Sequence, residues 1–131
     1  FTDHGFFQIS AGVDNKRIEE VLKAVLEECN KLKNSKVSEE ELNKVKECLI
    51  GNMKLSLESS DDIANFHGGQ ELLKREIISA EEKAKEIRKV TAVQIQYLAK
   101  DIFQNNKLNL ALIGPFKEHT EKAKFLKILK F

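Results

Sequence analysis

The chain has 131 residues, the length of one domain and too short for two of ordinary size. Its 22 Lys and Arg residues nearly balance its 21 Asp and Glu residues, and a net charge of +1 supplies no strong field for nucleic acid or an anionic membrane. No run approaches the roughly 18 apolar residues of a membrane span, and no signal peptide opens the chain. We therefore expect a soluble chain with no nucleic-acid partner and no membrane span.

The first predicted element is a strand from about Gly5 to Val13. Apolar residues at Phe7 and Ile9 alternate with Gln8 and Ser10, the period of a strand with one apolar face.

Two helices are predicted next. Asp14 or Asn15 caps the first, whose apolar residues recur every three or four positions: Ile18, Val21, Leu22, Val25, Leu26, Cys29 and Leu32. Ser38 and Glu41 form a capping box at the start of the second. Its expected buried face holds Leu42, Val45, Leu49 and Met53. Gly51 within it indicates close packing against a neighbour.

Three more helices are predicted beyond that point. The segment 59–62 ends the second helix and caps the third, in which Gly68-Gly69 implies a thin or kinked turn. Capping boxes at Ser79–Glu82 and Thr91–Gln94 begin a short helix through Ile87 and a last helix. The apolar stripe of the last helix is Ile95, Leu98, Ala99, Ile102 and Phe103.

A second strand is predicted from Leu108 to Ile113, and Pro115 stops it because proline cannot extend a ladder. The fold class is therefore α+β, with helices packed on one face of a small, incomplete sheet. We expect residues 1–115 to form the domain portion and residues 116–131 a basic amphipathic tail. The tail is expected to pack its apolar side onto its own domain and leave its lysines in water; a membrane surface or a partner is the alternative.

The strongest metal-ligand pair is His67 and Glu71, four positions apart on one predicted helix. No third ligand is near them in sequence, so a half-buried or surface histidine beside a packing glycine pair is the favoured interpretation. We expect no bound zinc in this chain.

No catalytic or cofactor-binding residue is assigned. Cys29 and Cys48 lie on apolar helical positions, which predicts that both are buried rather than nucleophilic. Two cysteines are too few for a disulfide framework, which favours a reducing compartment such as the cytoplasm but leaves the compartment unknown. His4 and His119 have no acidic residue at a spacing that would indicate a catalytic pair. The sequence also contains no glycine-rich phosphate-binding motif.

The chain begins with Phe1, and its only methionine is Met53, which indicates a piece of a longer parent protein. Two strands alone are marginal, and the missing strands are expected in that parent. The isolated chain is then expected to self-associate through strand edges or an exposed apolar sheet face.

Five segments in order resemble the pitrilysin/insulinase-type zinc peptidases, which include the mitochondrial processing peptidases. They are FTDHGFFQISAGV (1–13), VSEEELNKVK (37–46), LSLESS (55–60), VT (90–91) and LALIGP (110–115). The likeness is to the last part of the second, zinc-free domain. It covers the chain to about Pro115, and the tail follows no family pattern.

The resemblance implies a scaffold role. In this family the first domain carries a His-x-x-Glu-His motif and a distant Glu around zinc, and none of these is present here. The second domain contributes an Arg and a Tyr from a segment that would lie before Phe1. Glu41, Leu42, Lys46 and Glu58 match positions typical of the family and are interpreted as helix-end and packing residues.

Three functional hypotheses follow. The first is the C-terminal part of a zinc metallopeptidase that hydrolyses peptides in the intact protein, with zinc in the parent's first domain and this chain inactive alone. The second is a piece of a non-catalytic, peptidase-like subunit that serves in assembly or partner binding. The third is an independent helical module that docks a partner through its tail.

Overall fold

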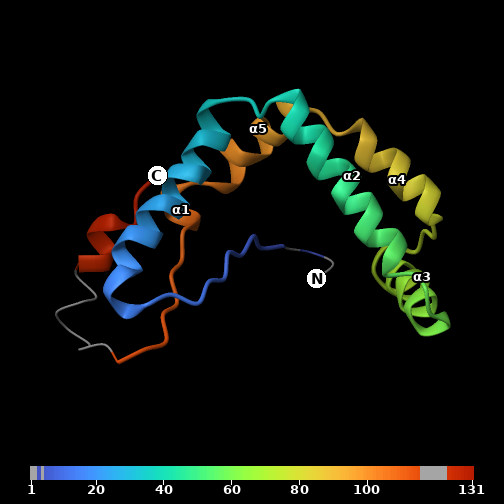
Figure 1. Ribbon diagram of the computed structural model, residues 1–131, viewed down its shortest axis with the longest axis horizontal. Coiled ribbons are helices and arrows are strands. Elements are labelled where there is room, and N and C mark those ends of the chain that lie inside the picture. Colours follow the sequence, from blue (N-terminus) through green and yellow to red (C-terminus); the bar gives the residue numbers. More distant parts are fainter. Residues whose placement is uncertain (1–2, 4, 116–123) are drawn as a thin grey trace. The chain divides into compact units, whose positions relative to one another are not determined.

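The computed structural model describes residue 3 and residues 5–115 and 124–131. In chain order its elements are η1 (Asn15–Arg17), α1 (Ile18–Asn34), α2 (Glu39–Leu55), α3 (Ser60–Lys74), α4 (Ala80–Lys89), α5 (Ala92–Ile102) and η2 (Asn105–Lys107) (Figure 1). A short helical stretch follows at residues 124–128. None of the described helices is long and apolar enough to cross a membrane.

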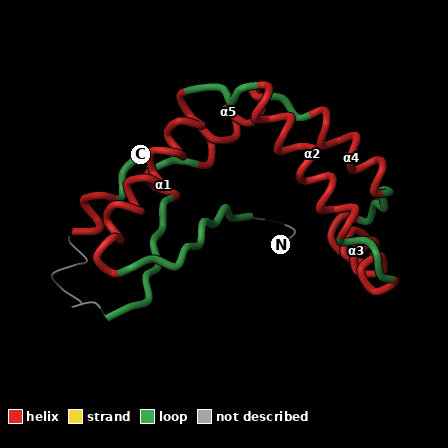
Figure 2. Tube along the Cα trace, in the orientation of Figure 1, coloured by secondary structure: helices red, strands yellow, loops and turns green. Residues whose placement is uncertain are grey.

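The predicted α+β fold is wrong for the described residues, which contain helices and loops but no strand (Figure 2). Residues 5–14 and 108–113 have no regular secondary structure. The physical reason is that a strand exists only through its ladder. An alternating sequence with no paired neighbour has no backbone hydrogen bonds to hold it in a sheet.

The predicted helix starts are confirmed where a side chain caps them. Ser38 Oγ accepts a hydrogen bond from the Glu41 backbone N–H at 3.1 Å, and Ser59 Oγ accepts one from Asp62 N–H at 3.1 Å. Ser79 makes a complete capping box, because the Glu82 carboxylate also accepts from Ser79 N–H at 2.8 Å. These serines satisfy orphan N–H groups that a helix start leaves unpaired.

The chain divides into two compact units, each described on its own. One unit comprises Phe1–Phe6 and Val37–Ala92, and thus α2, α3 and α4. The other comprises Phe7–Lys36 and Val93–Phe131, and thus α1, nearly all of α5 and the C-terminal residues. The predicted boundary at residue 115 stays a prediction.

The α1 unit has a small core. Cys29 of α1 is buried against Ala99 and Phe103 at the end of α5, with Val25, Leu32, Ile102 and Phe131 packed around them. The Phe131 ring lies 5.6 Å from that of Phe103, and Lys33 Nζ lies 5.0 Å above the Phe131 ring. The end of the chain thus packs on its own unit. Lys124, Lys127 and Lys130 are exposed, as expected, but Leu126 is 56% exposed as well, so the apolar side of residues 124–131 is only partly packed.

Candidate functional site

The apolar side of α2 is only partly covered. Leu42, Lys46 and Ile50 are buried, because they follow one another at four-residue spacing along the side that meets α4. Ala84 of α4 is 2% exposed. The buried face of α2 thus differs from the predicted one. Val45 is 48% and Leu49 53% exposed, although both were expected in the core.

A polar clamp fixes α2 to α4. The Lys46 ammonium donates to the Arg88 carbonyl at 3.1 Å, and the Arg88 guanidinium donates two hydrogen bonds to the Glu47 carboxylate at 2.9 and 3.1 Å. This pairing lowers the pKa of Glu47 and raises that of Arg88. Lys46 is thus a packing residue, as its family-like position suggested. A lysine at position 46, four residues from the apolar Leu42 and four from Ile50, was the sequence signal for the clamp.

The loop after α3 is held by Gln70. Its side-chain amide donates to the Ile78 carbonyl at 3.3 Å, and its carbonyl oxygen accepts from Ile78 N–H at 3.0 Å. Gln70 therefore pairs with Ile78 as a neighbouring strand would. α3 itself runs without a break through Gly68 and Gly69, where an added Cβ would meet nothing within 4 Å.

His67 and Glu71 do not converge with further ligands. His67 is half-buried with its ring 5.2 Å from that of Phe66, and its buried Nδ1 has no hydrogen-bond partner. Glu71 is exposed. Over the described ranges, no group of three His, Cys, Asp or Glu residues is arranged to hold a metal ion. His4 and His119 lie outside the described residues.

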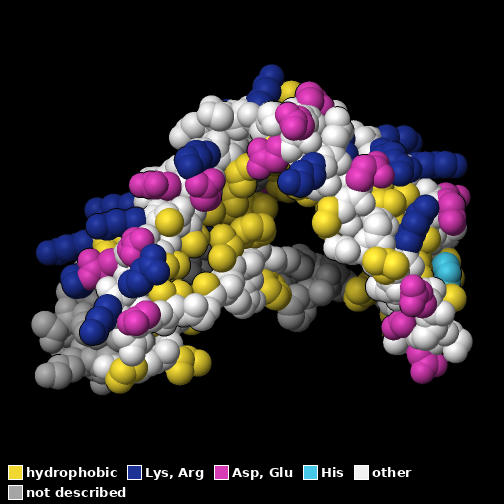
Figure 3. Space-filling view, in the orientation of Figure 1, with side chains coloured by type: hydrophobic (Ala, Val, Ile, Leu, Met, Phe, Trp, Pro, Cys, Tyr) yellow, Lys and Arg dark blue, Asp and Glu magenta, His cyan; other side chains and the backbone are white. Residues whose placement is uncertain are grey.

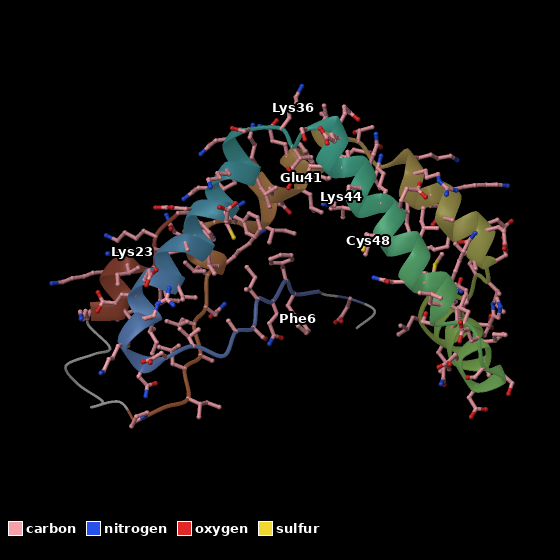
Figure 4. The ribbon with its side chains drawn as sticks, in the orientation of Figure 1. Phe6, Lys23, Lys36, Glu41, Lys44 and Cys48 are labelled. Carbon is pink, nitrogen blue, oxygen red and sulfur yellow. The ribbon has the colours of Figure 1, made fainter. Side chains whose placement is uncertain are left out.

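The two cysteines have different surroundings, although both were predicted to be buried. Cys29 is 5% exposed, and burial raises the pKa of its thiol. The prediction for Cys48 is wrong, because this thiol is exposed and projects from α2 (Figure 4). Asn52 Nδ2 donates to Cys48 Sγ at 3.7 Å. The predicted tight contact at Gly51 is also wrong, because an added Cβ there would meet no atom within 4 Å.

In the α1 unit, an apolar hollow of about 270 Å³ lies between the segment at Phe7 and Ile9 and the α1 helix. Val25, Cys29 and Leu32 line it from α1, together with Phe103. Hydrophobic side chains lie open on each of the two units (Figure 3). The feature that distinguishes the described residues is therefore their uncovered apolar surface, and not a cluster of catalytic groups. Such surface is typical of an interface.

The chain is similar to known proteins of one family. Residues 1–49 match the peptidase M16 inactive domain. An uncharacterized zinc protease of Streptomyces coelicolor is 27% identical over 118 residues, which are 90% of this chain and 26% of the relative. These matches support the resemblance of the chain to the pitrilysin-like M16 peptidase family.

The matched residues align with the inactive, C-terminal domain of that family. A second relative, the uncharacterized zinc protease YmxG of Bacillus subtilis, is 28% identical over 115 residues, which are 88% of this chain and 28% of that protein. The chain therefore spans about a quarter of the length of these curated relatives. No solved structure matches it.

Proposed function

We propose that this chain is the C-terminal part of the second, zinc-free domain of a zinc metallopeptidase, and that it serves there as a non-catalytic scaffold that helps to enclose a peptide substrate. The catalytic zinc is expected in the first domain of the longer protein. Two relatives named zinc proteases, aligned over about nine-tenths of this chain, carry the proposal.

The incomplete covering of α2 supports the scaffold role. Val45 and Leu49 form an exposed apolar strip beside the buried residues Leu42 and Ile50. Because about half of each side chain is already covered, leaving the remainder in water forgoes roughly 1 kcal/mol for each of them. The rest of the longer protein would gain that free energy by covering the strip.

A complementation experiment tests the proposal. The upstream part of the longer protein and this chain are purified separately, and the cleavage of a quenched fluorescent peptide is measured for each alone and for the mixture. We expect cleavage from the mixture, none from this chain alone, and about one zinc per upstream part by elemental analysis. Cleavage or stoichiometric zinc in this chain alone would overturn the proposal.

Two variants show whether the uncovered strip makes the contact. The double variant Val45→Asp/Leu49→Asp is expected to abolish complementation. The matched control Leu72→Asp, at an α3 position that is 82% exposed, is expected to keep it. An upstream part with neither zinc nor a His-x-x-Glu-His motif would support the alternative, a non-catalytic peptidase-like subunit for assembly or partner binding.

A further inference from the structure

We draw no further inference here: the strongest candidate, the apolar hollow that Val25, Cys29 and Leu32 of α1 line together with Phe103, lies open in a chain that spans about a quarter of the length of its relatives, and nothing in the structure shows what covers it.

Discussion

Lys46 of α2 and Arg88 of α4 are joined by a 3.1 Å hydrogen bond from a buried ammonium group to a main-chain carbonyl. The carbonyl lies in the last turn of α4, where helix C=O groups lack partners and carry partial negative charge. One lysine therefore completes the end of α4 and ties it to α2. Its 8% exposure shows that most of its stem is packed as well.

We predict that Lys46→Met destabilises the chain by about 1–3 kcal/mol, because methionine keeps much of the packing but removes a charged hydrogen bond from a carbonyl group. Urea unfolding followed by circular dichroism measures the loss. Lys44→Met, at an exposed position on the same helix (Figure 4), is the control and should change the stability little. Equal stability of the two variants would contradict the role assigned to Lys46.

The free energy of unfolding is expected to fall at low pH. Hydrogen bonds from the Arg88 side chain lower the pKa of Glu47, and those from the Ser79 backbone N–H and hydroxyl lower that of Glu82. A pKa that is lower in the folded state gives stability that is present above the ordinary value of about 4.5 and is lost as the pH falls through the lowered value.

Urea unfolding at a series of pH values tests this dependence. In Glu82→Gln the free energy of unfolding should fall less steeply below about pH 4.5, since the glutamine does not titrate. Added salt should weaken the Glu47 contribution, because its pairing with Arg88 is exposed and screened. A decline that is the same in Glu82→Gln as in the wild type would count against the capping carboxylate as a source.

The two thiols are predicted to react at different rates. Cys48 is exposed and should be modified quickly by a thiol reagent in the native chain. Cys29 is buried and its pKa is raised, so less of the reactive thiolate is present and access is blocked. One fast and one slow phase in a disulfide-exchange assay is the expected result. The fast phase should disappear in Cys48→Ser, and its persistence there would refute the assignment.

Arg75 offers a stabilising substitution. It ends α3 with φ of 54°, the left-handed conformation that favours glycine, and its N–H donates to the Glu71 carbonyl at 3.1 Å. Arg75→Gly removes steric strain of about 1–2 kcal/mol, partly offset by the greater freedom of glycine in the unfolded chain. We expect a net gain of about 0.5–1 kcal/mol in urea unfolding. Lys74→Gly, at the last residue of the helix, should instead lose up to about 1 kcal/mol.

The helix starts were accessible from the sequence because their causes are local. A serine cap and the glutamate or aspartate three positions later lie within one turn of each other, as at Ser38, Ser59 and Ser79. The resemblance to the family could be recognised from the sequence for a related reason, because it rests on short motifs that follow one another in a fixed order. The absence of assigned catalytic residues stays a prediction.

The tertiary structure decided what depends on distant parts of the chain. The alternating segments at 5–13 and 108–113 form no strand among the described residues, because a ladder needs a partner that local sequence cannot supply. The buried face of α2 was likewise decided by α4, which covers Lys46 and leaves Val45, Cys48 and Leu49 exposed. Periodicity shows that a helix has an apolar side, but only the packed neighbour determines how much of that side is removed from water.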